Sequence, residues 1–226
     1  MTSLYDEARA GLGDLSGAEG LLAGLARPER LTALIAELLA RPEDLAECAR
    51  WSFPHILGFE KLVLIAAPPV YMLRLHIWRP GGEGGLRHIH NHRADIISAV
   101  VRGRLEKQLF DRSASGLPLT EYREENDGRS WRLRLIGPAA LERGRALALA
   151  GGAVYRLPAR ALHLVSAAPD ETTMTLFMES RKIRETTEVF TPVDDPVPAA
   201  RVPKAALTVA AFRGRLEAAL AGLSGH

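Results

Sequence analysis

The sequence contains little cysteine and no long apolar run. Its single cysteine, Cys48, cannot form an internal disulfide, and it lies in an amphipathic helical pattern, so we expect a small buried hydrophobic residue. No uncharged run reaches the roughly 20 residues that a membrane-spanning helix needs. The first ten residues carry two acids and no apolar core, which does not resemble a signal peptide. We therefore expect a soluble, cytoplasmic protein with no membrane partner.

Lysine is also scarce, since only four of the 29 basic residues are lysines and the arginines are scattered. The formal net charge of +2 is too small to indicate binding to nucleic acid, and a solvated surface explains the arginines better. The composition, with 47% apolar and 25% charged residues, is that of an ordinary globular protein. At 226 residues we expect a single domain, residues 1–226, with one sizeable core.

The hydrophobic pattern divides this domain into three parts. Residues 1–52 are predicted to be helical, because apolar residues recur at helical spacing in residues 28–39 and Pro28 and Pro42 suit first turns. Residues 55–191 contain about ten short apolar or alternating runs, which predict an antiparallel sandwich or barrel. Residues 192–226 form a proline-rich link and a closing helix over 205–223. Within the strand region we expect a loop at Ser113–Pro118 and a hairpin turn at Glu125–Gly128.

Three histidines at strict alternation lie between a glycine-rich turn and an apolar run. A strand sends every second side chain to the same face, so His88, His90 and His92 would all project one way. Neutral imidazole is the commonest protein ligand for divalent transition metals. Asp95 has the opposite parity and would point away, unless a bulge reverses the alternation.

A second signal follows 71 residues after His92. Gly151 and Gly152 form a turn, a short strand and Pro158 come next, and His163 then stands alone in an apolar strand. A lone histidine there is commonly a hydrogen-bonded core residue. Together with the first cluster it becomes a candidate metal ligand. The plain alternative is a protein with surface histidines and no metal.

Both segments resemble the two motifs of the cupins, a jelly-roll superfamily. The first motif is a glycine, five residues, His-x-His, three or four residues and an acid. The second is a glycine, a proline and a histidine on a neighbouring strand. Two registers fit the first motif: one begins at Gly82 and uses His88, His90 and Asp95, and the other begins two residues later, at Gly84, and uses His90 and His92. The implied fold class is mainly β, a cupin jelly-roll barrel with N-terminal helices and a C-terminal helix.

Residues 55–180 further resemble thiol dioxygenases of the cysteine dioxygenase type. The segment Ile89-His90-Asn91-His92 and the following glycine-containing strand match that family, as do the apolar strand ending at Trp78 and Leu162-His163-Leu164-Val165. This resemblance implies that His90, His92 and His163 are the metal ligands. His88 and Asp95 are then additional ligands or outer groups that support the site.

The resemblance implies an oxidoreductase that uses Fe(II) and O₂ to convert a small-molecule thiol to a sulfinic acid. Two departures argue against cysteine as the substrate. Glu60 stands where that family has an arginine for the substrate carboxylate, and an acid would attract an amine or a cation instead. The family's Ser-His-Tyr relay falls on Thr175, Phe177 and Glu179, so its tyrosine is absent.

Other candidate pocket residues are Arg74 and His76, which share a strand face with Trp78, together with Tyr155. Two alternatives remain open for the function. Zn, Ni or Mn could act as a Lewis acid in an isomerase or lyase of the same fold. A non-catalytic, ligand-binding cupin is the other alternative. A homodimer is compatible with the sequence, because jelly rolls often pair through sheet edges.

Overall fold

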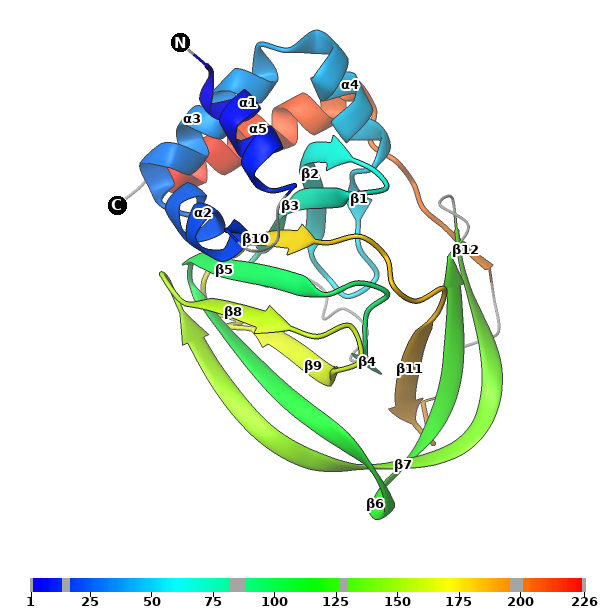
Figure 1. The fold of residues 1–226 in the computed structure, drawn as a ribbon. Helices are drawn as coiled ribbons and strands as arrows, with labels where there is room; N and C mark the ends of the chain where they lie inside the picture. Colours follow the sequence, from blue (N-terminus) through cyan, green and yellow to red (C-terminus); the bar gives the residue numbers. More distant parts are fainter. Residues whose placement is uncertain (1, 14–16, 82–87, 127–129, 196–200, 225–226) are drawn as a thin grey trace.

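A computed structural model describes the chain except for residues 1, 14–16, 82–87, 127–129, 196–200 and 225–226 (Figure 1). Gly82, Gly84 and the hairpin turn at Asp127–Gly128 therefore lie outside the described residues. Four helices come first: α1 (Leu4–Gly11), α2 (Ala18–Leu25), α3 (Pro28–Leu39) and α4 (Pro42–Arg50). Helix α5 (Val209–Ser224) ends the described chain. In this described part, no helix has both the length and the apolar character needed to cross a membrane.

The strands between these helices form two antiparallel sheets. The first sheet has the order β1 (Phe53–Pro54), β2 (Glu60–Ala67), β3 (Tyr71–Trp78), β10 (Thr173–Glu179), β5 (Ile96–Arg102), β8 (Val154–Leu157). The second has the order β11 (Thr187–Pro192), β4 (Ile89–His90), β9 (Leu162–Ala167), β6 (Arg104–Asn126), β7 (Ser130–Ala150), β12 (Arg201–Pro203). Strand β11 also pairs with β6, which closes β11, β4, β9 and β6 into a ring. The chain is thus mainly β, with two antiparallel sheets as in a jelly roll and helices from both ends of the chain, as the sequence predicts.

The helices cover one face of the first sheet (Figure 1). Their apolar stripes and every second residue of β3 and β10 share one buried core, which includes Leu34, Phe212, Leu75 and Leu176. Because side chains alternate along a strand, the residues between these core positions must face the second sheet instead. The covering helices therefore determine which side chains of the first sheet can reach a cavity.

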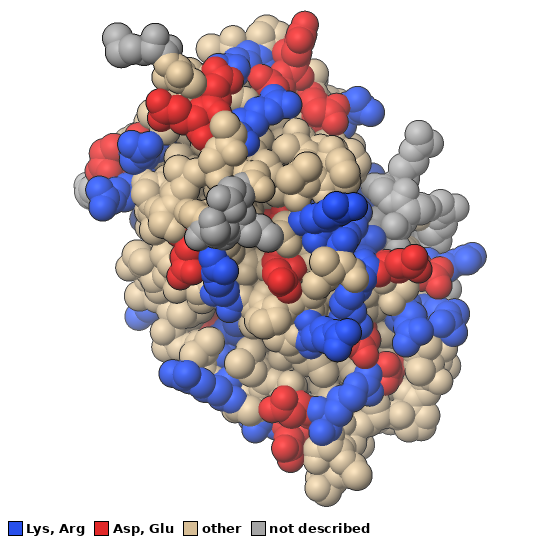
Figure 2. All heavy atoms as spheres, in the orientation of Figure 1, with Lys and Arg blue, Asp and Glu red and all other residues tan. Residues whose placement is uncertain are grey.

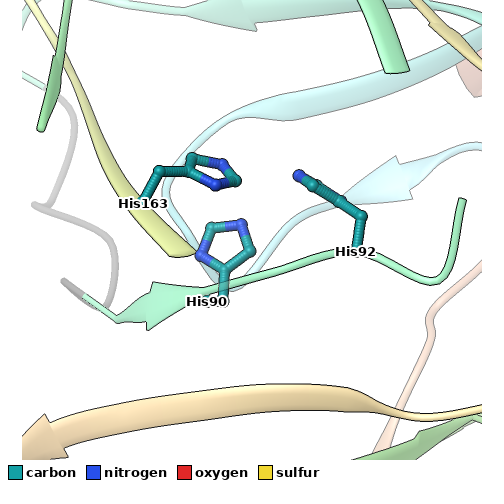
Figure 3. A group of neighbouring side chains, drawn as sticks. All are labelled: His90, His92 and His163. Carbon is teal, nitrogen blue, oxygen red and sulfur yellow. The ribbon is translucent and has the colours of Figure 1, made fainter. Parts of the chain in front are cut away.

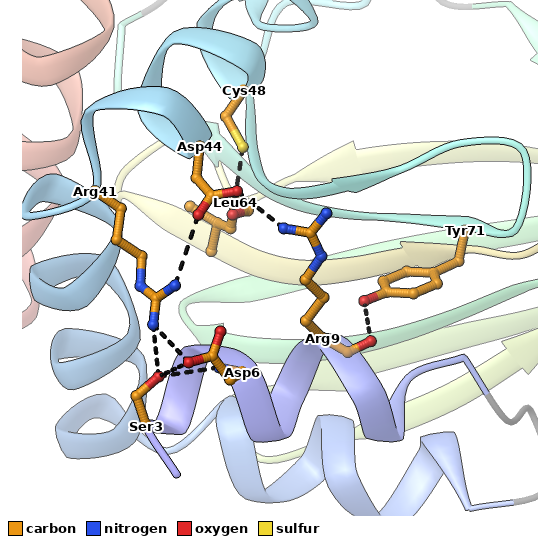
Figure 4. Close-up of polar contacts among 8 residues, drawn as sticks. All are labelled: Ser3, Asp6, Arg9, Arg41, Asp44, Cys48, Leu64 and Tyr71. Carbon is orange, nitrogen blue, oxygen red and sulfur yellow. Dashed lines mark hydrogen bonds and ion pairs between the residues drawn. The ribbon is translucent and has the colours of Figure 1, made fainter.

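Polar contacts attach α1 to the rest of this helical layer (Figure 4). The Ser3 hydroxyl caps α1 by accepting a hydrogen bond from the Asp6 N–H at 3.2 Å. Arg41 contacts the Asp6 carboxylate at 2.7 Å, and the Tyr71 hydroxyl donates to the Arg9 carbonyl at 2.7 Å. Solvent screens an ion pair this exposed, so apolar burial supplies most of the attachment.

Strands β6 and β7 form one long curved hairpin, which differs from the prediction. Arg112 and Leu117 both pair with Leu141, so the residues between them form a bulge inside a continuous strand. The predicted loop at Ser113–Pro118 is therefore wrong, because its turn-forming residues make a bulge and the pairing resumes beyond them. A Cβ at Gly116 would lie 2.3 Å from the Leu141 backbone, which explains the glycine. The strands on either side of the predicted hairpin turn do pair, with Asn126 opposite Trp131.

Cys48 is buried on α4, as expected of a small core residue. Its Sγ donates to the Leu64 carbonyl oxygen at 3.4 Å. Burial raises the pKa of this thiol to about 12, because an apolar environment disfavours the thiolate.

We predict that Cys48 does not react with a thiol reagent in the native protein at pH 8. The thiolate is the reactive form, and almost none is present four units below the pKa. A chromogenic disulfide releases a coloured thiolate when a protein thiol attacks it. The absorbance should show no reaction in buffer and one reactive thiol per chain in denaturant. Rapid labelling of the folded protein would contradict the burial.

Candidate metal centre

The three predicted ligand histidines converge at the junction of β4 and β9 (Figure 3). His90 and His163 are directly opposite each other across these two antiparallel strands. His92 follows β4 by two residues, and its backbone N–H donates to the Ala159 carbonyl at 2.9 Å. One nitrogen from each of the three imidazoles lies within 4.8 Å of the other two. This spacing lets a single ion contact all three rings.

Backbone carbonyls determine which nitrogen two of these rings present. Nδ1 of His90 lies 3.1 Å from the His88 carbonyl oxygen, and Nδ1 of His163 lies 3.1 Å from that of Ala161. A carbonyl oxygen only accepts, so Nδ1 carries the proton in both rings and Nε2 keeps its lone pair. Nε2 of His92 is buried without a hydrogen-bond partner among the described residues. A divalent metal ion would satisfy all three lone pairs, so the donor set fits such an ion.

Burial keeps these imidazoles neutral. It lowers the pKa of His90 to about 4 and the pKa values of His92 and His163 well below the usual range. The ammonium group of Lys107 nearby lowers all three further. Neutral imidazole is the form that binds a metal, so at pH 7 no proton has to leave before coordination.

His88 and Asp95 do not join the cluster. The Asp95 carboxylate accepts a hydrogen bond from the Ala159 N–H at 2.7 Å, and so holds the loop whose carbonyl anchors His92. The His88 side chain is buried and lines the cavity, but it is not part of the three-histidine group. Of the two registers of the cupin motif, the one that uses His90 and His92 therefore fits the structure. The glycine of that register, Gly84, lies outside the described residues.

The alternation that points His90 and His92 inward turns Asn91 to the other side. Asn91 is fully buried. Its side-chain NH₂ donates to the Glu188 carboxylate, and its Oδ1 accepts a hydrogen bond from the Glu188 N–H at 2.8 Å. Arg112 and Arg184 contact the Glu188 carboxylate at 2.8 and 3.1 Å. Sequence reasoning missed this contact between Asn91 and Glu188. The available signal was the polar residue Asn91 between the candidate ligands His90 and His92.

A cavity of about 160 Å³ extends from the histidines between the two sheets. Six further candidates from the sequence line it: Arg74, His76, Tyr155, Thr175, Phe177 and Glu179. Arg74 and Glu179 form an ion pair with each other across β3 and β10. Trp78 lines the same cavity. All except Tyr155 come from the faces of β3 and β10 that point away from the helices.

Aromatic rings continue from the three histidines along one wall. The ring centroids are 5.9 Å apart for His92 and Phe177, 4.7 Å for Phe177 and His76, and 4.4 Å for His76 and Phe59. His55 stacks on the far side of Phe59, also at 4.4 Å. Nε2 of His76 is buried and has no hydrogen-bond partner among the described residues. The wall can thus contact a flat or apolar ligand and offer it one polar atom.

Glu60 lies outside this cavity, which corrects the expectation of an acidic pocket residue. Its carboxylate pairs with Arg215 of α5 and, at 3.4 Å, with Arg79. The next residue, Lys61, has the opposite parity and lines the cavity. The cavity therefore has a basic side chain where the sequence predicted an acid, and Glu60 gives no reason to expect a preference for amines or cations.

Sequence reasoning also missed Lys61, Lys107, Glu124 and Lys204, which line the cavity. Lys107 lies over the Tyr155 ring, with Nζ 4.4 Å from the centroid. Burial raises the pKa of Glu124 to about 7. The available signal was the scarcity of lysine, together with the position of Lys61 and Lys107 inside apolar strands.

No family model matches the sequence, and no curated protein matches it. Many solved structures show a distant likeness to the chain, and three of them illustrate its extent. A structure from a study of the DMSP lyases RdDddP and RnDddQII gives 19% identity over 54% of this chain and 47% of its own, with a TM-score of 0.31. A hydroquinone 1,2-dioxygenase in complex with Cd²⁺ and 4-hydroxybenzonitrile gives 13% identity over 54% and 64%, with a TM-score of 0.34. An RmlC-like cupin from Shewanella frigidimarina gives 13% identity over 56% and 79%, with a TM-score of 0.33.

The chain thus matches about half of the length of the first of these structures and under two thirds of the second. A likeness of this extent carries no argument about the reaction or the substrate of this chain. The site has to be interpreted from its own residues.

We predict that His163→Ala loses bound metal, whereas His88→Ala and Asp95→Ala retain it. Changes to groups that only support the ligands typically weaken metal binding about 10- to 100-fold, and losing one of three ligands should weaken it more. Metal content per chain, measured by elemental analysis after desalting, tests this. Circular dichroism controls for folding. Loss of metal in Asp95→Ala, with His163→Ala unaffected, would contradict the assignment.

Proposed function

We propose that this chain is a metal-dependent enzyme of the cupin superfamily, a non-haem Fe(II) oxygenase that acts on a small-molecule thiol other than cysteine. The observation that carries the proposal is the set of three neutral imidazoles, two of them fixed through Nδ1, in the lining of a cavity. Fe(II) held by His90, His92 and His163 would supply open coordination positions for a substrate and O₂ side by side.

The number of ligands supports a catalytic site over a structural one. Structural metal sites are closed, commonly with four protein ligands, whereas catalytic sites keep a position open. Asp95, the nearest candidate for a fourth ligand, uses its carboxylate on the Ala159 N–H. His88 is also absent from the cluster. Three protein ligands leave room for an exchangeable molecule.

The remaining residues of the cavity bind and orient the substrate and limit the access of water. Phe59 and Phe177 exclude water along one wall. The Thr175 hydroxyl faces the same cavity, opposite His76 on the neighbouring strand. Because Glu179 is paired with Arg74, neither of these two charges is fully available for binding a substrate amine or carboxylate. This arrangement supports a substrate other than a free amino acid.

Oxygenation of the thiol would follow RSH + O₂ → RSO₂H, in which sulfur loses four electrons and both oxygen atoms enter the product. The test is anaerobic purification, elemental analysis, and O₂ uptake with a panel of thiols. We expect stoichiometric iron, uptake with at least one thiol, and two ¹⁸O atoms in the product from ¹⁸O₂. His163→Ala should abolish uptake, and Arg30→Ala, an exposed change on α3, should not.

Tightly bound zinc, nickel or manganese without O₂ uptake for any thiol would contradict the proposal. That outcome would favour a cupin in which the metal acts as a Lewis acid. Absence of any metal after purification and reconstitution would instead favour a non-catalytic, ligand-binding protein.

A further inference from the structure

A second cavity, of about 460 Å³, adjoins the one that contains the histidines. Six residues line both cavities, among them Lys61, Arg93 and Lys204. The second cavity continues outward past Trp51 and Tyr71, beneath the C-terminal end of α4. Its volume lies in the range of about 300–1,000 Å³ that is typical of pockets for small molecules. A ligand could therefore lie in the outer cavity and extend to the three histidines.

The outer cavity is strongly basic. Its lining contains seven basic side chains and one acidic side chain, Glu179. Glu179 pairs with Arg74, and Arg50 pairs with Glu47 at 2.8 Å. On the face shown in Figure 2, basic side chains gather beside a hollow between the helical layer and the long hairpin.

Arg181 and Lys182 add positive charge at the exposed side of the outer cavity. In the inner cavity, the carboxylate of Glu124 faces Arg93 and Lys204 and attracts both. Even with Glu124 counted, basic groups outnumber acidic ones along the shared wall. Positive charges this close together repel one another, so an anion would be favoured there.

Lys61 lies on the wall that the cavities share and is only 7% exposed. Its Nζ is 4.5 Å from the centroid of the Phe53 ring, and no ion pair of this lysine occurs within the described residues. A buried ammonium group without a counter-ion is costly, because burial removes it from water. The pKa of Lys61 is lowered well below its usual value by this burial and by the neighbouring basic groups. A bound anion would remove both penalties.

His76, which lines the inner cavity, gives a separate sign that a ligand extends there. It is opposite Lys61 across β2 and β3, it is 6% exposed, and its Nε2 has no hydrogen-bond partner within the described residues. Buried polar atoms are nearly always hydrogen-bonded, so an unpartnered one beside a cavity marks a place for a ligand atom.

All four lysines of the chain lie on these two cavities. Lys107 lines the inner cavity, Lys182 the outer one, and Lys61 and Lys204 line both. The 25 arginines, in contrast, are spread through the chain. The rarest basic residue is thus concentrated at a single place in the fold.

We propose that the outer cavity binds a phosphoryl group of the substrate, whose thiol end reaches the three histidines. This inference rests on the proposed function for the thiol end only. A phosphoryl dianion matches several cations better than a single carboxylate, and the guanidinium group of Arg181 can donate two parallel hydrogen bonds to it. The substrate class is then a small phosphorylated thiol.

The test is calorimetric titration with inorganic phosphate at pH 8, on the protein as purified and after metal removal. We expect one phosphate per chain with the same affinity in both forms. The double variant Arg181→Ala and Lys182→Ala should weaken binding by at least about tenfold, because charge-assisted hydrogen bonds contribute enough for that factor. Both residues are exposed, so folding should be preserved.

The matched control is Arg27→Ala with Arg30→Ala, which removes the same charge from exposed positions at the start of α3, outside both cavities. Its phosphate affinity should equal that of the wild type. The proposal is overturned by an absence of phosphate binding, by equal weakening in the control, by equal affinity for acetate, or by binding that disappears with the metal. Phosphate binding as expected in a protein that never takes up metal would contradict the oxygenase and leave the anion site standing.

Discussion

The pairing of His90 with His163 across β4 and β9 is the contact on which the site depends. These two residues come from segments more than 70 positions apart, and the antiparallel register places their rings directly side by side. Strand β4 is very short, so it holds this register through its neighbours: Val189 of β11 pairs with His90, and β11 in turn pairs with β6. The ring of four strands thus fixes two ligands, and the third follows on the same chain segment.

The third ligand needs its own support, because His92 lies beyond the end of β4. Two contacts on opposite sides supply it. Asn91 is held by Glu188, and the His92 backbone is held by Ala159, whose own N–H binds Asp95. In the structure the Asp95 carboxylate therefore positions backbone beside the site, and it is not part of the three-histidine group. The spacing of Asp95 fits the acid of the cupin motif, so the motif alone would place it among the ligands, whereas its carboxylate holds the Ala159 backbone.

Strand parity explains both what the sequence predicted and what it missed. Alternation placed His90 and His92 on one face without any tertiary information, whereas the partner at His163 came from resemblance, since no local rule specifies a pairing over that distance. The resemblance to the thiol dioxygenases misled at Glu60, because the neighbouring residue Lys61, of opposite parity, is the one that faces the cavity. The bulge at Ser113–Gly116 was mistaken for a loop because a bulge and a loop have the same local composition, and only the partner strand distinguishes them.

The helical layer links this geometry to the charge of the cavities. Because α1–α5 bury one face of the first sheet in apolar contacts, every polar residue of β2, β3 and β10 that is not at an edge has to face the second sheet. Lys61, His76 and Thr175 are direct cross-strand neighbours on that face. Desolvating a lysine there lowers stability unless something of opposite charge compensates it. The chain keeps this lysine beside Arg74 and Lys204, so a bound anion would offset its electrostatic cost, and the proposed metal and anion sites would then act on one ligand from its two ends.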